Sequence, residues 1–167
     1  HSKETIKIDR FIHRDAKDFL NITVFDREKT EWNDTCHSWK TKWPVCPEEN
    51  PTKKVDLYYF MKCLNDFKRT DDVVISDAGS AFYVCCQATE IWGQQRYITS
   101  SSQAEMGFTI PACIGAAFAK DGDVIGVTGD GSFMMNLQEL QTIAHYNLPV
   151  KLFVWNNEGY LSIRTTQ

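Results

Sequence analysis

The chain has 167 residues, of which 43% are hydrophobic and 24% charged, and its formal net charge at pH 7 is -4. This composition is enough to bury a core, and the mild acidity without a basic stripe argues against nucleic acid or an anionic membrane surface as the main partner. No apolar run approaches the length of a membrane span, and the first residues contain no signal-peptide core, so we expect a cytoplasmic protein.

The cysteines indicate packing residues and not a framework of disulfides. Most of them lie in predicted helices among apolar neighbours, where a free cysteine behaves as a small hydrophobe. We therefore expect all six to be thiols: Cys36, Cys46, Cys63, Cys85, Cys86 and Cys113. Cys36, His37 and Cys46 would form half of a zinc site, but no Cys-x-x-Cys pair completes it.

Residues 1–53 predict an incomplete unit followed by a connection. Ile6-Lys7-Ile8 alternates like a short strand and residues 16–20 predict a helix, which together are too short to bury a core. Residues 28–54 are polar and rich in Trp and Pro without a clear period, so we expect an ordered but irregular connection. Its tryptophans are interpreted as packing anchors, with a ligand site as the alternative: Trp32, Trp39 and Trp43.

From residue 54 onwards the hydrophobic pattern becomes that of an α/β domain. Asp56 is placed to cap a helix whose buried face carries Leu57, Phe60, Met61, Leu64 and Phe67. Residues 72–76 predict a buried strand that ends at Asp77-Ala78-Gly79-Ser80, and a helix with Cys85, Cys86 and Ile91 follows. Residues 96–98 predict another short strand, and Pro111 is expected to open a helix of small residues that runs to Ala119.

Residues 123–159 predict a strand, a helix and a second strand. The apolar run at residues 124–128 stops at Gly129-Asp130-Gly131-Ser132, and the run at residues 150–155 enters Asn156-Asn157-Glu158-Gly159. Between them we expect one helix, with Asn136 and Glu139 as a capping box and Asn147 and Pro149 at its end. Neighbouring parallel strands have their carboxyl ends side by side, so Asp130 and Asn157 should converge.

The polar groups at these two strand ends suit a cation together with a phosphate. A carboxylate, an amide oxygen and a backbone carbonyl favour Mg²⁺ over zinc, and the N–H groups of a glycine-rich turn at a helix start suit phosphate. A plain turn explains Gly-Asp-Gly taken alone. A P-loop would need Gly-Lys-Ser/Thr, a dinucleotide fingerprint needs other glycine spacings, and an EF-hand starting at Asp121 would need oxygen ligands at Ile125 and Ser132.

The turn Gly129-Asp130-Gly131-Ser132, followed one strand later by Asn156-Asn157, resembles the thiamine-diphosphate motif of the acetolactate synthase and pyruvate decarboxylase superfamily. The resemblance implies that Mg²⁺ is held by Asp130, by the Asn157 side chain and by the main-chain carbonyl of Gly159. It also implies that Gly129, Gly131 and Ser132 cradle the diphosphate. The metal would then join the protein to the cofactor.

The same resemblance implies roles for two earlier segments. Gly79-Ser80 would be the first loop that contacts the diphosphate, although a bare turn also explains it. Met106 would be the bulky hydrophobe that wedges between the two rings of thiamine diphosphate and bends the cofactor, with a gap-filling methionine as the alternative. No catalytic side chain is assigned, because the family's activating glutamate belongs to a pyrimidine-binding domain of the same or a partner subunit.

These patterns predict an α/β fold with a doubly wound parallel sheet flanked by helices, truncated at both ends. Residues 1–53 are expected to be the tail of a preceding middle domain plus a connecting segment. Residues 54–167 are expected to be the domain that binds thiamine diphosphate and Mg²⁺, without its C-terminal part. The implied parent is an acetolactate synthase-like homo-oligomer that decarboxylates a pyruvate-like 2-keto acid and joins the product to an acceptor. A simple 2-keto acid decarboxylase and a non-catalytic metal- and phosphate-binding module are the alternatives.

Overall fold

The computed structural model describes residues 7–22, 30–120 and 122–166. The chain divides into two compact units, His1–Lys42 and Trp43–Gln167. The second unit thus begins before residue 54, where the sequence pattern placed the domain boundary. Ile6 of the predicted first strand lies outside the described residues, as do His1 and Asp121, and Lys7 and Ile8 are not part of a strand.

The first unit contains two helices, α1 (Ala16–Ile22) and α2 (Thr30–Lys42). The sequence predicted α1, but it was wrong about α2, which was expected to be irregular. No residue of α2 is buried, and a helix that is polar all round lacks the apolar stripe by which helices are predicted. Trp32 and Trp39 contact each other edge to face, with ring centroids 5.7 Å apart, and are 54% and 48% exposed. Their interpretation as packing anchors stays a prediction.

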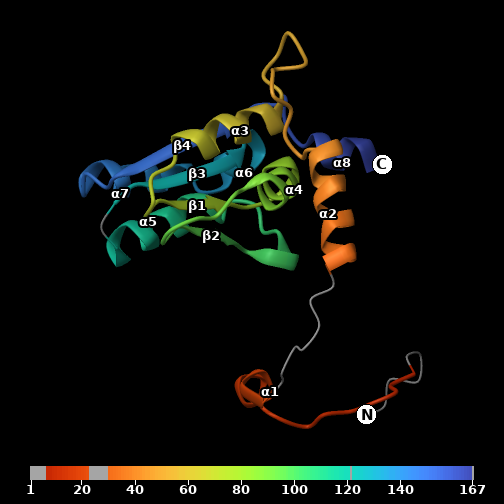
Figure 1. Ribbon diagram of the computed structural model, residues 1–167. Helices are drawn as coiled ribbons and strands as arrows, with labels where there is room; N and C mark the ends of the chain where they lie inside the picture. The colour runs from red at the N-terminus through yellow and green to blue at the C-terminus, as the bar shows by residue number, and fades with distance from the viewer. Residues whose placement is uncertain (1–6, 23–29, 121, 167) are drawn as a thin grey trace. The chain divides into compact units, whose positions relative to one another are not determined.

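The second unit is built on a four-stranded sheet with the strand order β2-β1-β3-β4 (Figure 1). Its strands are β1 (Val73–Ser76), β2 (Arg96–Thr99), β3 (Val124–Gly129) and β4 (Val150–Trp155). All three pairings are parallel, which confirms the predicted α/β class and the neighbouring placement of β3 and β4. From β1 the chain proceeds to β2 on one side and β3 to β4 on the other, so the strand order reverses between β1 and β3. In open α/β sheets, ligands bind beyond the carboxyl ends of the strands at such a point.

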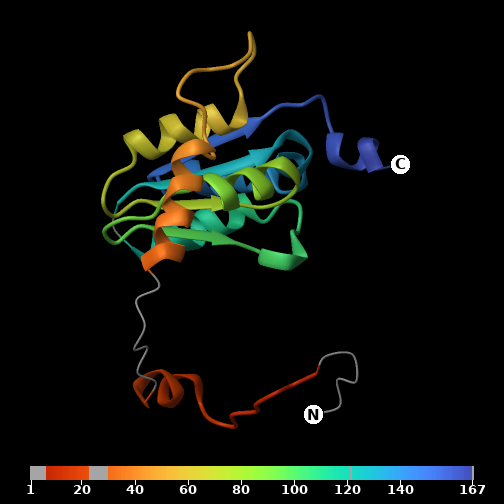
Figure 2. The ribbon, with the colours of Figure 1, turned by 45° about the vertical axis from the view of Figure 1, so that its right-hand side comes forward.

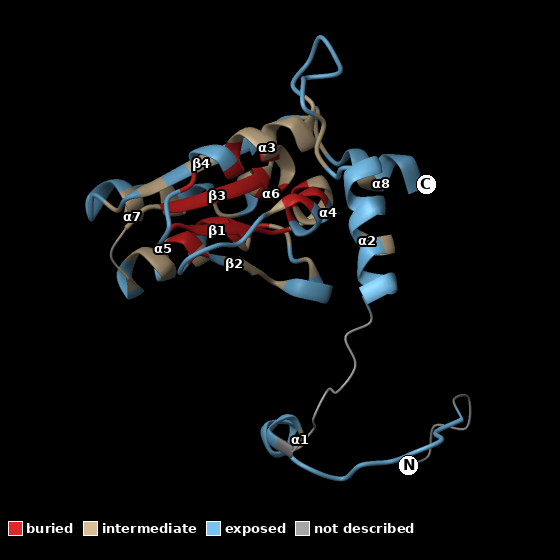
Figure 3. Cartoon of the chain, in the orientation of Figure 1, coloured by how far each residue is buried: buried red, intermediate tan, exposed pale blue. Residues whose placement is uncertain are grey.

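Helices cover both faces of this sheet, as Figures 1 and 2 show. Helices α3 (Leu57–Phe67) and α4 (Gly79–Ala88) pack on one face, where Met61, Val84 and Val127 belong to one hydrophobic cluster. Helix α5 (Thr109–Ala119) packs on the other, where Cys113 joins Ile75 and Val124. Figure 3 shows the buried residues concentrated in the strands and in the helix sides that face them.

The helix on residues 57–67 follows the predicted pattern except at its end. The Asp56 side chain caps α3 by accepting hydrogen bonds from the N–H groups of Tyr58 and Tyr59, at 2.9 and 3.0 Å, as predicted. Met61 and Leu64 are buried, but Phe67 is 85% exposed and does not belong to the buried face. Helix α5 begins at Thr109, so Pro111 lies inside its first turn and does not open it. Ile91 lies beyond the end of α4 and is exposed.

The connection from β3 to β4 differs from the single helix that was expected. It consists of α6 (Asp130–Met135), the short 3-10 helix η2 (Leu137–Glu139) and α7 (Leu140–His145). The predicted capping box is wrong, because the Asn136 side chain donates to the Gly107 carbonyl at 2.8 Å and caps no helix. A second 3-10 helix, η1 (Ser101–Gln103), follows β2, and α8 (Leu161–Thr166) follows β4. None of the described helices is long and apolar enough to cross a membrane.

Candidate functional site at the carboxyl edge of the sheet

A cavity of about 250 Å³ lies where the strand order reverses, at the carboxyl ends of the strands. The structure brings eight of the nine predicted site residues to its wall: Gly79, Ser80, Met106, Gly129, Asp130, Gly131, Ser132 and Asn157. They come from the segments after β1, β3 and β4 and from the segment before α5. The ninth, Gly159, is joined to Asp130 by a hydrogen bond. Residues widely separated in the sequence thus meet at one point of the fold.

The loop after β3 and the loop after β4 are held together by the Asp130 carboxylate. Its Oδ1 accepts the Gly131 N–H at 2.9 Å, and its Oδ2 accepts the Gly159 N–H at 2.7 Å. The backbone around Gly159 has three consecutive positive φ angles, +63° at Glu158, +83° at Gly159 and +46° at Tyr160. Positive φ is costly for residues other than glycine, so this turn is held by its surroundings. The predicted convergence of the Asp130 and Asn157 loops is confirmed.

One polar atom at this point has no partner. Asn157 Oδ1 is buried and accepts no hydrogen bond from any described residue. A buried polar group without a partner is costly, and a site for a bound ion is one of its ordinary explanations. A divalent cation beside the Asp130 carboxylate would satisfy this oxygen, so the residues present fit the Mg²⁺ that the motif implies.

The turn at Gly131 leaves no space for a side chain. A Cβ atom there would stand 3.1 Å from Cε1 of Tyr160 and 3.3 Å from the methyl carbon of Met106. Met106 and Tyr160 therefore face the same glycine from different segments. The sequence pattern missed Tyr160, although its position next to Gly159 was a signal, and it also missed the α8 residues Leu161, Ser162 and Ile163 in the cavity wall.

The cavity has polar groups that suit an anion, but its wall carries no positive side chain. Helix α4 begins there at Gly79, and its N-cap residue, Ala78, makes no side-chain cap hydrogen bond. Its first N–H groups carry the positive end of the helix dipole. Asp130 is the one charged residue among the described residues that line the wall. A diphosphate placed beside this carboxylate would need a cation to neutralise it, which is a second reason why the site fits Mg²⁺.

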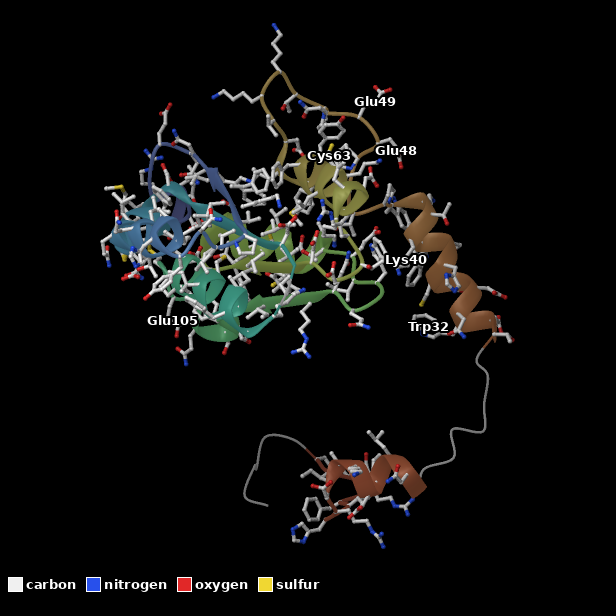
Figure 4. The ribbon with its side chains drawn as sticks, turned by 90° about the vertical axis from the view of Figure 1, so that its left-hand side faces the viewer. Trp32, Lys40, Glu48, Glu49, Cys63 and Glu105 are labelled. Atoms are coloured by element: carbon white, nitrogen blue, oxygen red, sulfur yellow. The ribbon has the colours of Figure 1, made fainter. Side chains whose placement is uncertain are left out.

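All six cysteines are free, and five of them lie in helices. Burial raises the pKa of the Cys85 and Cys113 thiols to about 12, and at Cys113 the nearby Asp77 carboxylate adds to this effect. These two thiols lie on opposite faces of the sheet, in its two hydrophobic clusters. They are therefore packing groups. Glu105, next to Met106, is exposed (Figure 4) and does not line the 250 Å³ cavity.

Fold and cavity together define an α/β domain with a parallel sheet and a polar cavity at the carboxyl edge of that sheet. Residues 77–167, more than half of the chain, match the family model described as thiamine pyrophosphate enzyme, C-terminal TPP binding domain. Thiamine pyrophosphate is another name for thiamine diphosphate. The chain therefore belongs to the thiamine pyrophosphate enzyme family and carries its C-terminal cofactor-binding domain.

The chain is also similar to acetolactate synthase large subunits. It is 33% identical over 144 residues to the isozyme 2 large subunit of Escherichia coli (strain K12), covering 82% of this chain and 25% of that protein. It is 35% identical over 164 residues to a probable acetolactate synthase large subunit of Methanococcus aeolicus, covering 93% of this chain and 26% of that protein. It is 31% identical over 128 residues to the chloroplastic acetolactate synthase 1 of Zea mays, covering 76% of this chain and 20% of that protein. The chain thus spans about a quarter of the length of these relatives.

Proposed function

We propose that this chain binds thiamine diphosphate through Mg²⁺ and supplies one half of the active site of an acetolactate synthase-like enzyme of the cytoplasm. The enzyme would decarboxylate a pyruvate-like 2-keto acid and join the product to an acceptor. The observation that carries the proposal is the cavity at the strand reversal, with one carboxylate, one buried unpartnered amide oxygen and no cationic side chain among the described residues of its wall. These groups are incomplete without a divalent cation and an anion.

Each of the predicted site residues has a distinct role in this proposal, through its side chain or its backbone. Asp130, Asn157 and the carbonyl of Gly159 hold the metal, and the metal neutralises the diphosphate beside it. Gly79 and Ser80 offer the first N–H groups of α4 to the diphosphate oxygens, and Gly129, Gly131 and Ser132 form the other side of the cradle. Gly131 can approach the cofactor closely because it has no side chain. Each group binds or orients, and none of them transfers a proton.

Met106 contacts the cofactor between its two rings in this proposal. Its methyl carbon lies 3.3 Å from the Cβ position of Gly131, so it lies beside the cradle in the same cavity. An unbranched thioether adapts to a flat ring on either side. When bound, the cofactor supplies an acidic thiazolium carbon and an electron sink for decarboxylation, and the protein contributes position.

The proposal gives this chain half of a site. The pyrimidine ring and its activating glutamate would be supplied by a pyrimidine-binding domain of the same or a partner subunit, in a homo-oligomer. Exposed apolar side chains in the cavity wall agree with a surface that another domain covers: Tyr83, Tyr160, Leu161 and Ile163. Apolar patches of this kind mark interaction sites.

Calorimetric titration tests the binding part of the proposal. The chain is titrated with thiamine diphosphate, with Mg²⁺ and then with a chelator, and ADP serves as the control ligand. We expect binding that depends on Mg²⁺ and favours thiamine diphosphate. Equal affinity for ADP would indicate a general metal- and phosphate-binding module and contradict the proposal.

An assay of carbon dioxide release tests the half-site. The 167-residue chain with saturating thiamine diphosphate and Mg²⁺ should release no carbon dioxide from pyruvate above the background of cofactor alone. Addition of a pyrimidine-binding domain should restore release. Substantial release by the chain alone would mean that it carries its own acid or base, and Glu105→Gln would then be the first variant to assay. Release without ligation to an acceptor would identify a simple decarboxylase.

A further inference from the structure

One buried carboxylate at the strand reversal has no role in the proposed metal or diphosphate site. Asp77 directly follows β1, is 0% exposed and forms no ion pair with any described residue. Its Oδ1 accepts the Ala78 N–H at 2.7 Å. Its Oδ2 accepts the Thr128 hydroxyl at 3.0 Å and the Thr109 N–H at 3.4 Å. A carboxylate buried without a cation needs such donors to offset the cost of its burial.

Each of the three donors belongs to a different segment of the cavity wall. Ala78 lines the cavity itself and precedes Gly79 and Ser80. Thr109 is the first residue of α5, three positions after Met106. Thr128 lies two positions before Asp130 in β3. One carboxylate is therefore tied to the diphosphate turn, to the segment that carries the wedge residue and to the strand that delivers the metal ligand.

The two helix starts beside Asp77 have no caps of their own. Neither Ala78, before α4, nor Phe108, before α5, makes a side-chain cap hydrogen bond. The Asp77 carboxylate accepts an N–H group at each of these starts and is favoured by the positive end of both helix dipoles. A second bond also joins α5 to β3, because the Thr109 hydroxyl donates to the Val127 carbonyl at 3.3 Å. The start of α5 is thus fixed to the strand whose end carries Asp130.

We propose that Asp77 is a positioning residue, which fixes the Gly79-Ser80 turn, Met106 and Asp130 relative to one another and so preforms the cofactor cavity. This inference rests on the proposed function. A buried charge is weak support for stability in itself, because desolvation offsets much of the gain from its hydrogen bonds. Its effect here is geometric: loosening these contacts lets three binding segments move independently, and the cofactor must then order them as it binds.

Substitutions at Asp77 and Thr128 separate the three contacts. In Asp77→Asn, the amide oxygen still accepts the Ala78 N–H, and the amide NH₂ can donate to the Thr128 hydroxyl. The Thr109 N–H, however, then faces a donor and loses its bond. Thr128→Val removes the hydroxyl at nearly constant size. Of the three Asp77 contacts it breaks only the one to β3, and it also removes the longer contact of this hydroxyl to the Gly129 carbonyl, at 3.3 Å. Val74→Ala, on the same strand β1 in the core, is a control that lowers stability and changes no residue of the cavity wall.

The experiment measures the Kd of Mg²⁺-thiamine diphosphate by calorimetry at a temperature at which every variant is folded, and amide hydrogen exchange without ligand. Asp77→Asn should weaken binding by about tenfold or more, corresponding to about 1.4 kcal/mol, and speed exchange at the Thr109 N–H. Thr128→Val should weaken binding by about threefold or more. Val74→Ala should lower the Tm while changing Kd by less than about twofold.

Asp77→Asn binding within about twofold of the unmodified chain, or an equal loss in Val74→Ala, would overturn the proposal. If Asp77→Asn does not fold, Thr128→Val tests the proposal instead, and an unchanged cofactor affinity in that variant overturns the proposal. If the unmodified chain does not bind thiamine diphosphate, the proposed function fails. Amide hydrogen exchange without ligand still tests the role of Asp77. If the Thr109 N–H exchanges equally slowly in Asp77→Asn, the positioning role is refuted.

Discussion

Strand β3 has an aspartate just beyond each of its ends, and the two are held in opposite ways. At the amino edge, Asp123 pairs with the ammonium group of Lys151 and with Arg69 at 3.5 Å. The hydrogen bond from Lys151 lowers the pKa of the Asp123 carboxyl. At the carboxyl edge, Asp130 accepts two backbone N–H groups and pairs with no cationic side chain among the described residues. Its charge is therefore available to a metal ion.

The cavities at the two edges show that volume does not identify the site. The cavity at the amino edge is larger, about 700 Å³, and includes Asp71, Arg96 and Lys120 in its wall. The Lys120 ammonium already donates to the Asp71 carbonyl. Asp72 keeps one buried oxygen without a partner there, but its other oxygen accepts the Arg69 N–H at 2.8 Å. At the carboxyl edge, Asn157, with its unpartnered oxygen, lines the same cavity as the Asp130 carboxylate, which is the arrangement that the proposed cation site requires.

The largest effect is expected from removing the aspartate at the carboxyl edge. Asp130→Ala should weaken Mg²⁺-dependent binding of thiamine diphosphate by more than about 100-fold, because loss of a direct ligand should exceed the 10–100-fold effect of outer ligands. Asp123→Ala is the matched control, since it removes the same group from the other end of β3. Its affinity should stay close to that of the unmodified chain. Similar losses in both variants by calorimetry would contradict the difference between the edges.

Met106 should affect turnover more than affinity. In an enzyme assembled with a pyrimidine-binding domain, Met106→Ala should lower kcat by about tenfold or more and change cofactor Kd much less, since the diphosphate contacts remain. Met134→Ala, at an exposed methionine of α6, is the control and should change neither value. Unchanged hydrogen–deuterium exchange at the thiazolium carbon in Met106→Ala would refute the wedge role.

Two glycines offer a smaller test of the same comparison. Gly131→Ala should press on Tyr160 and Met106 and weaken cofactor binding by about three- to tenfold. Gly115 lies in α5 with no atom within 4 Å of its Cβ position, so Gly115→Ala should raise the unfolding free energy by about 0.5–1 kcal/mol through helix propensity. Cofactor titration and urea unfolding of both variants check this. Improved binding in Gly131→Ala would contradict the tight cradle.

The smallest effect near neutral pH concerns the buried thiols between the two edges. The pKa of Cys85 and Cys113 is about 12 in the folded chain, against 9.0 for an unperturbed thiol. A raised thiol pKa means that the unfolded chain loses protons first. The contribution of these two thiols to the free energy of unfolding is therefore fully present below about pH 9 and is lost between about pH 9 and 12. Urea unfolding at increasing pH should show this decline, and Cys113→Ala should reduce it. A thiol reagent at pH 8 should modify the exposed Cys86 well before its neighbour Cys85, and a reversed order would contradict the burial.

Sequence reasoning reached those parts of the fold and site that local patterns encode. The four strands, the Asp56 cap and the turn at residues 129–132 each follow from residues close together in the chain. Neighbouring parallel strands then bring Asp130 near Asn157, because geometry dictates it. The family resemblance added Met106 and Gly79-Ser80, and the structure brings these residues to the same cavity.

The residues that were missed depend on contacts far along the chain. The sequence pattern indicates only that Asp77 begins a turn, whereas its hydrogen-bond partners Thr109 and Thr128 lie 32 and 51 positions away. Asn136 was predicted to cap a helix, but Gly107 offered its side chain a partner 29 positions away. Helix α2 lacks a buried face, so no hydrophobic pattern indicates it. Tyr160 lines the cavity with a positive φ angle, which no local pattern predicted. For Asp77 and Asn136, hydrogen bonds to residues distant in the sequence overrode the local pattern.

The most direct test of the difference between the two edges is to locate the metal. Crystals of the chain grown with thiamine diphosphate and Mn²⁺ in place of Mg²⁺ give an anomalous difference map that shows where the ion binds. We predict one strong peak at the carboxyl edge, within about 2.0–2.3 Å of an Asp130 carboxylate oxygen, Asn157 Oδ1 and the Gly159 carbonyl. A peak at the amino edge, beside Asp71 or Asp123, with none at Asp130 would contradict the account.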